Sequence, residues 1–343
     1  MKKMSRAFKI LLPLIVLLQS SVFAQDNENE NRNKNKKKYE FVKTKAVNKS
    51  YNVSSSDKLN IQNSFGSVEV TTWDRNEIKV DVNVEVTANT EALAQKIIDR
   101  ISVSDSRSGK DISFKTDMKD MNESKRDNKD DKSSMEINHT ISMPAGNPLS
   151  IRNEFGSTKV PDFRGEVDLT SKFSSLTTGN LTNIKGINVE FGKANLANIT
   201  SAPVNIKFSK ATIAKLSGSV KLNLEFCSNV RLSLDNNLNS LDLKTSYSTV
   251  NLKPLGDLQA SYNISTSFGS FKNTTNVKFD SDADEKDDNR YNPKFDFQYN
   301  GKNGSGSIPV KVKSSFGKII VGEASEEDMK GKEKNKTKDK SRT

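Results

Sequence analysis

The chain offers few side chains that could perform covalent or metal chemistry. Its 343 residues include one cysteine, Cys227, and one histidine, His139. A single cysteine excludes an intramolecular disulfide and a cysteine-based metal site, and a single histidine excludes a zinc site built on a histidine pair. We expect Cys227 to be a buried structural thiol and His139 to lie in a strand, either partly buried or on the surface.

An acidic run near the C-terminal end has part of the spacing of a calcium loop. Asp280, Asp282 and Asp284 match the first three ligand positions of an EF-hand. Glu285 stands where that loop needs glycine for its sharp turn, and Tyr291 stands where it needs a bidentate glutamate. The sequence therefore predicts a solvated loop and no metal-binding residue.

Acid–base catalysis on a polysaccharide would require carboxylates gathered on neighbouring strands. Asp235, Asp242 and Asp257 do not recur in phase with one another. The chain also has no G-x-S-x-G, P-loop or H-E-x-x-H motif. We therefore predict no catalytic residue, no cofactor and no enzymatic activity.

A short phrase centred on an aromatic residue recurs along the chain. From Phe155 to Phe268 the aromatic returns in steps of 17 to 21 residues. A small residue follows it, and apolar residues come mainly three and five positions later. This alternation with a period of two predicts strands with one buried face. The aromatic positions of the phrase are Phe65, Phe155, Phe173, Phe191, Phe208, Phe226, Tyr247, Phe268 and Phe316.

The near-constant spacing favours an all-β, single-chain parallel β-solenoid with rungs of about 18 residues, and a β-sandwich or barrel is the alternative. Rungs about 4.8 Å apart would stack the aromatic rings inside the fold. A thin core of this kind agrees with a hydrophobic content of only 33%. If the rings are buried, Phe191→Ala or Phe208→Ala should cost about 3–5 kcal/mol.

The residue before the aromatic alternates in charge along the series. Stacked rungs would place these opposite charges side by side, where each pair contributes about 0.2–1 kcal/mol and penalises a slipped register. The members of this predicted charge ladder are Glu154, Lys172, Glu190, Lys207 and Glu225.

The segment 39–150 has a different pattern and is predicted to cap the solenoid. Alternating apolar residues in 58–86 predict two or three strands, and 135–143 predicts another. Between them, 89–101 has apolar residues at helical spacing, with Asn89 or Thr90 as the N-cap. Such a cap would cover strand edges that otherwise invite aggregation.

Residues 1–24 have a basic start, an apolar run and small residues before Gln25, which is typical of a cleaved signal peptide. An uncleaved anchor is the alternative, but the run is shorter than the roughly 20 residues a span needs. No other segment is apolar enough to span a bilayer. Loss of the leader lowers the net charge from +11 to +7, which allows weak attraction to anionic surfaces. The remaining predicted segments are a disordered stretch at 25–38, a charged loop at 105–134, the solenoid at 151–322 with a charged insertion at 280–306, and a disordered tail at 323–343.

The leader, the repeated FGS-type phrase and the short helix after the first strands together resemble the bacterial "putative adhesin" family, common in Bacteroidetes. Its sister family comprises the head-domain adhesin-like proteins. The resemblance covers roughly 58–322 and implies an exported β-solenoid with an adhesive role. It transfers no catalytic or binding residue to this chain.

Three functions remain open at this point. The first is an exported surface adhesin that binds a glycan or matrix ligand through one face. The second is a periplasmic protein that binds another envelope component, such as an envelope protein. The third is a carbohydrate-active enzyme, which the missing carboxylate cluster disfavours. Export makes nucleic acid an unexpected partner.

Overall fold

The computed structural model describes residues 39–118, 130–282 and 295–330, and the chain from Tyr39 onward forms one unit. The described strands belong to a single mixed sheet of 23 strands. The elements of the central part are β8 (Leu149–Glu154), β9 (Ser157–Val160), β10 (Val167–Lys172), β11 (Ser175–Leu181), β12 (Ile184–Glu190), β13 (Lys193–Thr200), β14 (Pro203–Lys207), β15 (Lys210–Glu225) and β16 (Val230–Ser246).

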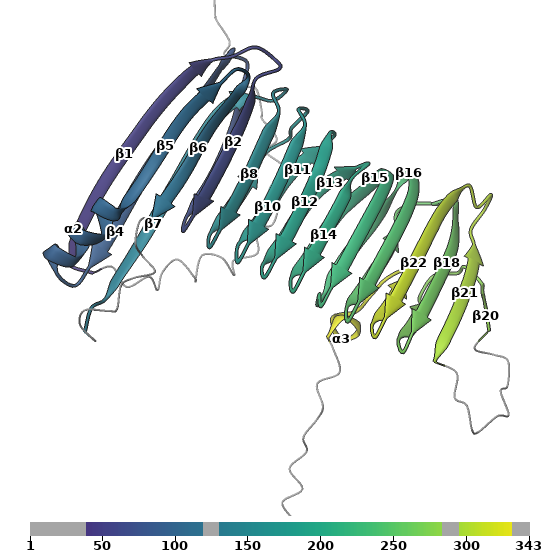
Figure 1. The fold of residues 1–343 in the computed structure, drawn as a ribbon. Coiled ribbons are helices and arrows are strands. Elements are labelled where there is room, and N and C mark those ends of the chain that lie inside the picture. The colour runs from purple at the N-terminus through teal and green to yellow at the C-terminus, as the bar shows by residue number, and fades with distance from the viewer. Residues whose placement is uncertain (1–38, 119–129, 283–294, 331–343) are drawn as a thin grey trace, which may run out of the picture. The chain divides into compact units, whose positions relative to one another are not determined.

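The central strands form two rows, and within each row neighbours pair in parallel. In the first row β8 pairs with β10, β10 with β12, and β12 with β14. In the second row β9 pairs with β11 and β11 with β13. The long strands β15 and β16 contribute to both rows. Figure 1 shows the first-row strands side by side, with the turns into the second row aligned along one edge.

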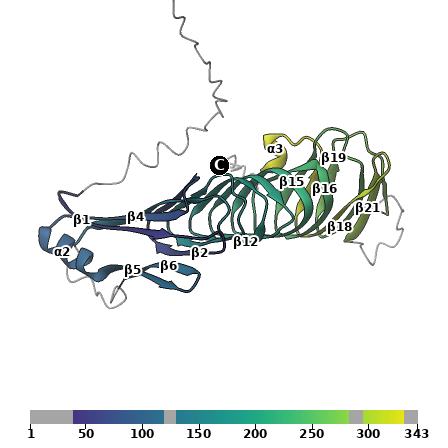
Figure 2. The same ribbon diagram turned by 90° about the horizontal axis from the view of Figure 1, so that it is seen from above.

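The N-terminal part contains β1 (Phe41–Asn52), β2 (Lys58–Ser64), β3 (Ser67–Trp73), β4 (Glu77–Ala88), α2 (Glu91–Arg100), β5 (Ile101–Ser108), β6 (Asp111–Met118) and β7 (Ser133–Pro144). β2 and β3 join the central rows by pairing in parallel with β8 and β9. β4 pairs antiparallel with β1 on one side and with β7 on the other, and β5 pairs antiparallel with β6. Figure 2 shows β1 and β4 in one layer and β5 and β6 in the other.

Helix α2 confirms the helical prediction for 89–101. The Thr90 side chain caps it by accepting a hydrogen bond from the backbone N–H of Leu93, and Ala94 and Ile98 are buried. The strands predicted within 58–86 and at 135–143 are present as β2, β3, β4 and β7. Both predictions succeeded because a local period, of two or of 3.6 residues, is sufficient to identify the element.

The C-terminal part contains β17 (Thr249–Pro254), β18 (Ala260–Ser267), β19 (Ser270–Asn273), β20 (Phe279–Ser281), β21 (Asp296–Lys302), β22 (Ile308–Ser315), β23 (Lys318–Val321) and α3 (Glu326–Met329). Here the order in space departs from the order in sequence. β22 pairs in parallel with both β16 and β18, and β23 pairs with both β17 and β19. β21 adds antiparallel to β18, and β20 adds antiparallel to β21.

The predicted parallel β-solenoid is therefore wrong. The strands form one all-β, mixed sheet that nearly closes on itself, with antiparallel pairs among β1, β4 and β7, between β5 and β6, and among β18, β20 and β21. A period of two reveals which face of a strand is buried but not the direction of its partner. Apart from β18, which leads into Phe268, the antiparallel strands lie in segments without the aromatic phrase, so the phrase carried no information about their direction.

Small aliphatic side chains from both rows fill the interior, as in Val68, Ile151, Leu176 and Val204, each buried completely. Among the described phenylalanines, Phe114 and Phe163 are the large side chains that are fully buried. The low aromatic content of the core agrees with the low hydrophobic content of the sequence.

Several segments that the sequence predicts to be loops or tails contain strands or a helix in the structure. β5 and β6 include positions 105–108 and 111–118 of the predicted charged loop, β20 and β21 occupy parts of the predicted insertion, and α3 lies in the predicted tail. The predicted signal peptide and the segment 25–38 lie outside the described residues. In the described part of the chain, no helix has the length and apolar character required to span a membrane.

Candidate functional site

The aromatic residues of the recurring phrase stack into one continuous row, here called the ring ridge. Neighbouring ring centroids lie 4.7–5.1 Å apart, with interplanar angles of 1–18°. Nine steps near the strand spacing give the ridge a length of about 43 Å. In spatial order its rings are Phe65, Phe155, Phe173, Phe191, Phe208, Phe226, Tyr247, Phe316, Phe268 and Phe295.

The ridge lies outside the sheet, so the expectation that the rings are buried is wrong. From Phe155 onward each ring of the ridge is 45–54% exposed, and Phe65 is half-buried. The sequence pattern misled because an aromatic residue at a regular position is most often a core residue. The inward positions are instead the flanking apolar residues of each strand, such as Val189 and Ala194.

Backbone conformation explains why the rings point outward. The nine aromatic residues of the phrase have positive φ, between 48° and 63°, at the turn from the first row to the second. This left-handed conformation costs an L-residue about 1–2 kcal/mol, and asparagine or glycine tolerates it better. Stacked aromatic pairs contribute about 0.5–1.5 kcal/mol each. The stacking can therefore offset the cost of the turn, but only if successive turns all carry a ring.

The residue after each ring is small because the backbones of neighbouring turns approach each other closely at this position. A Cβ on Gly156 would lie 1.8 Å from the backbone oxygen of Gly66, and one on Gly192 would lie 1.9 Å from that of Ser174. Two serines at this position use their hydroxyls between turns: Ser209 Oγ accepts a hydrogen bond of 3.0 Å from the Gly192 N–H, and Ser248 Oγ accepts one of 3.0 Å from the Cys227 N–H. The small position is thus part of the hydrogen-bonding between turns.

Cys227 occupies the same small position and is 1% exposed, which confirms the prediction of a buried thiol. Its Sγ donates to the backbone oxygens of Ile206 at 3.2 Å and Glu225 at 3.3 Å. Burial raises the pKa of the thiol, so the nucleophilic thiolate is disfavoured.

Stacking also determines which part of each ring a partner could reach. Each ring inside the row has a neighbour on both faces less than 5.2 Å away, as Phe191 has in Phe173 and Phe208. The faces are therefore covered, and the exposed part is the C–H edge. A sugar that packs on the face of an aromatic ring finds no such face along the ridge.

The predicted charge ladder lies directly beside the ridge. Lys172 pairs with Glu190 at 3.5 Å, and Lys207 pairs with Glu225 at 3.1 Å. Glu154 is in register with Lys172, and Glu190 is in register with Lys207. These side chains are partly exposed, so each pair is screened by solvent.

Removal of one ladder charge should have a small effect. Lys207→Ala is expected to lower the free energy of unfolding by less than about 1 kcal/mol, because the Lys207–Glu225 pair is exposed to solvent. Urea unfolding at low and high salt measures this difference, which should shrink as salt is added. A loss of several kcal/mol would show that the pair is essential for the turn.

Two pairs of lysines face each other across neighbouring strands close to the ridge. Lys193 is in register with Lys210, two positions after the rings of Phe191 and Phe208, and Lys244 is in register with Lys313. All four lysines are exposed. None has a carboxylate partner within the described part of the chain. Like charges directly opposite on paired strands destabilise a sheet, so an anion placed between them would be stabilising.

Sequence reasoning missed three features of this site. Phe316 stands between Tyr247 and Phe268, Phe295 extends the ridge by one ring, and the lysine pairs are juxtaposed. The place of Phe316 depends on β22 inserting beside β16, and that of Phe295 depends on β21 adding antiparallel to β18; nothing local in the sequence indicates either pairing. The Lys193–Lys210 pair could have been found, since both residues stand two positions after an aromatic of the phrase.

The carboxylates considered for catalysis lie apart in structural roles. Asp235 is buried and pairs with Lys215 at 3.1 Å. Asp257 accepts hydrogen bonds from Gln259 and Asn303, and Asp242 is exposed. Within residues 39–118, 130–282 and 295–330, no three His, Cys, Asp or Glu side chains are grouped to hold a metal. Of the acidic run, Asp284 lies outside the described residues.

His139 lies in β7 between Val68 of β3 and Val82 of β4. It is completely buried, and neither ring nitrogen has a hydrogen-bond partner in the described structure. Burial lowers its pKa to about 4, which keeps the imidazole neutral near pH 7. The surface alternative considered for this residue is therefore wrong.

Comparison with known proteins gives structural likenesses only. No family model matches the chain, and no curated protein matches it. Among solved structures, a putative adhesin from Bacteroides fragilis has 12% identity and a TM-score of 0.41, covering 81% of this chain and 97% of that one. A putative cell adhesion protein from Clostridium sporogenes has 14% identity and a TM-score of 0.24, covering 82% and 100%. A putative lipid binding protein from Parabacteroides distasonis has 10% identity and a TM-score of 0.30, covering 81% and 97%. At these TM-scores the likenesses assign no role to this chain.

Proposed function

We propose that the chain is an exported, non-enzymatic binding protein whose ring ridge and adjacent lysines lie against an anionic lipid surface. The observation that carries this proposal is the size of the exposed aromatic row. An aromatic side chain offers about 150–250 Å² of surface, so nine half-exposed rings place about 700–1,100 Å² of aromatic surface in water. The largest apolar patch of a typical monomer is about 300–600 Å², and larger ones mark interaction surfaces.

The chemistry of the ridge favours lipid over glycan. Its exposed atoms are ring edges, because stacking covers the faces, so sugar rings cannot pack flat along it. Aromatic side chains are suited to the interfacial region of a bilayer, where an apolar body can be buried beside polar headgroups. A row of ring edges about 43 Å long could contact many lipids at once.

The lysine pairs supply the preference for negative charge. Lys193 and Lys210 stand beside the ridge on one side, and Lys244 and Lys313 stand about 10 Å before the ridge on the other strand row, at about 3.3 Å per residue. Each lysine near an anionic surface contributes about 1 kcal/mol. Phosphate groups between paired lysines would also relieve the repulsion within each pair.

Vesicle co-sedimentation tests the proposal. The chain should bind vesicles of phosphatidylcholine with phosphatidylglycerol and should bind vesicles of phosphatidylcholine alone much more weakly. Lys193→Gln combined with Lys210→Gln removes two positive charges. This should reduce the binding free energy by about 2 kcal/mol and weaken binding about 30-fold. Lys159→Gln is the matched control, because Lys159 is an exposed lysine of the second row already paired with Glu69 at 3.0 Å.

Ring variants test the ridge itself. Asparagine tolerates positive φ, so Phe191→Asn with Phe208→Asn removes two rings while suiting the backbone of the turns. Circular dichroism confirms that the variant is folded, and its vesicle binding should fall at least fivefold. Unchanged binding would exclude the ridge as the contact surface. Absence of vesicle binding by the unmodified chain would overturn the proposal, as would a dimer that dissociates when the rings are removed.

A further inference from the structure

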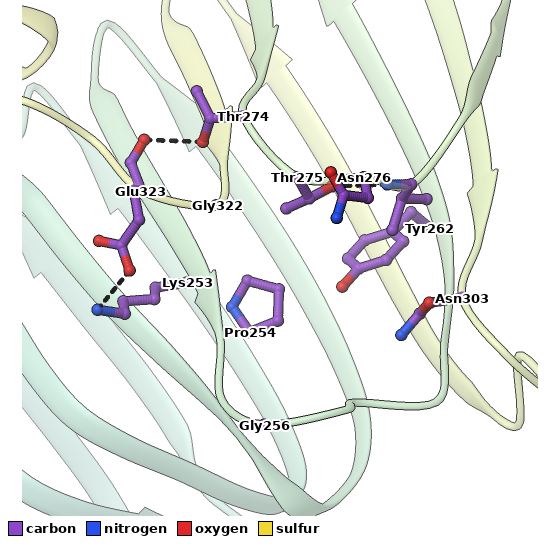
Figure 3. Close-up of a pocket in the computed structure, with 11 residues that line it drawn as sticks. Lys253, Pro254, Gly256, Tyr262, Thr274, Thr275, Asn276, Asn303, Gly322 and Glu323 are labelled. Carbon is purple, nitrogen blue, oxygen red and sulfur yellow. Dashed lines mark hydrogen bonds and ion pairs between the residues drawn. The ribbon is translucent and has the colours of Figure 1, made fainter.

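A second candidate site lies at the C-terminal part of the sheet, away from the ring ridge. A cavity of about 340 Å³ opens between the loop after β17, the segment after β19 and the end of β23. Figure 3 shows Tyr262, Asn276 and Asn303 on one side of it and Lys253, Pro254 and Glu323 on the other. Ligand pockets usually measure about 300–1,000 Å³, so this volume suits a small ligand.

The Tyr262 hydroxyl is the polar group that marks the cavity as a site. The residue is 3% exposed, and its ring packs against Phe279 with centroids 5.6 Å apart. In Figure 3 its hydroxyl points into the cavity. It has no hydrogen-bond partner within the described residues, and burial raises its pKa to about 12. It is therefore a neutral phenol that can both donate to and accept from a ligand.

Asn303 beside Tyr262 is held in one orientation by the protein. Its Nδ2 donates to Asp257 Oδ1 at 3.0 Å and to the backbone oxygen of Leu258 at 2.9 Å. Both amide hydrogens are thereby used, which leaves Oδ1 as an acceptor for a ligand. Asn276, which is exposed at the mouth, adds a carboxamide that can donate and accept.

The charge of the cavity favours a neutral ligand. Lys253 and Glu323 form an ion pair of 2.7 Å across the rim, so neither charge is left for a ligand. The Glu323 backbone oxygen also accepts a hydrogen bond of 2.8 Å from Thr274 Oγ1, which fixes this side of the rim. Pro254 and Val277 form apolar parts of the cavity wall.

We infer that this cavity binds a neutral, polyhydroxylated ligand of one or two sugar rings. A sugar hydroxyl can donate to Asn303 Oδ1 and can both donate to and accept from Tyr262 and Asn276. The C–H face of a pyranose suits the walls at Pro254 and Val277. This inference is independent of the proposed contact between the ring ridge and lipid.

Saturation-transfer NMR on the full chain tests the inference. The probes are glucose, galactose, N-acetylglucosamine and maltose, with glucuronate as a charged comparison. At least one neutral probe should bind, and Tyr262→Phe, which removes only the hydroxyl, should weaken it at least fivefold. Tyr247→Phe is the control, because it removes a hydroxyl from the exposed ridge.

Three results would overturn the inference: no binding of any neutral probe, equal binding by the Tyr262→Phe variant, or tighter binding of glucuronate than of the neutral sugars. Asn276→Ala provides a second variant that keeps the fold, since Asn276 is exposed, and it should also weaken binding. Vesicle binding by Tyr262→Phe should equal that of the unmodified chain. Failure of the sugar-binding inference can therefore be distinguished from failure of the proposed lipid contact.

Discussion

Phe163→Ala should lower the free energy of unfolding by about 3–5 kcal/mol, the loss expected for a fully buried phenylalanine. Phe163 is 1% exposed and lies between β9 and β10, where its backbone N–H donates to the oxygen of Asn180 at 2.9 Å. Removal of the ring would leave a cavity that neighbouring strands cannot close, because the sheet hydrogen bonds fix their spacing. Urea unfolding followed by circular dichroism measures the loss.

Phe191→Ala provides the matched comparison, since it makes the same chemical change on the ridge. Phe191 is 46% exposed, and its contacts are mainly the two neighbouring rings. Two stacking contacts of about 0.5–1.5 kcal/mol each give an expected loss of about 1–3 kcal/mol. This value replaces the 3–5 kcal/mol expected from a buried ring. Equal losses for the two variants would show that the ridge is as important to the core as Phe163.

The second large effect is a loss of stability in mild acid caused by His139. The pKa of His139 is about 4 in the folded chain and about 6.5 in an unfolded one, so the unfolded state takes up a proton first. The contribution is fully present above pH 6.5 and declines as the pH falls toward 4. The loss should reach about 2 kcal/mol by pH 5 and about 3 kcal/mol at pH 4.

His139→Leu should remove this dependence, because leucine is apolar and similar in volume. Denaturation midpoints between pH 7 and 5 should fall for the unmodified chain and stay level for the variant. Asp81 and Asp162 do not contribute to the change between pH 7 and 5. Hydrogen bonds from Asn48 and Asn180 lower the pKa of these carboxyls, so their contributions to stability are lost only below about pH 4. A level profile for the unmodified chain would show that the buried imidazole accepts a proton without opening the sheet.

The sequence predicted the local elements better than their arrangement. An N-cap at Asn89 or Thr90, a strand at 135–143 and a buried Cys227 all follow from short patterns. The structure has Thr90 as the cap, a strand over 133–144 and Cys227 buried. The direction of β1, β4 and β5 could not be predicted, because alternation is the same for parallel and antiparallel strands.

The ridge shows where a correct spacing led to a wrong position. The steps from Phe155 to Tyr247 correctly suggested that successive aromatics stack, whereas Tyr247 and Phe268 are separated by Phe316. The side of the sheet on which the rings stack depends on the sign of φ at the turn. Bulky residues seldom adopt positive φ, so a propensity argument places Phe191 in a strand and not at a left-handed turn. The cavity at Tyr262 was not anticipated, since it is formed by segments up to 70 residues apart in the sequence.

The position of β22 determines when the C-terminal part of the sheet can fold during synthesis. β22 lies between β16 and β18, yet it follows both in the chain, as β23 follows β17 and β19. When synthesis has reached position 302, β18, β19 and β21 already exist but have no strand that joins them to β16. The C-terminal part must therefore wait, unattached, for the last strands to enter between elements made earlier. A chain that stops before Ile308 would lose not only its end but also the anchorage of the preceding fifty residues.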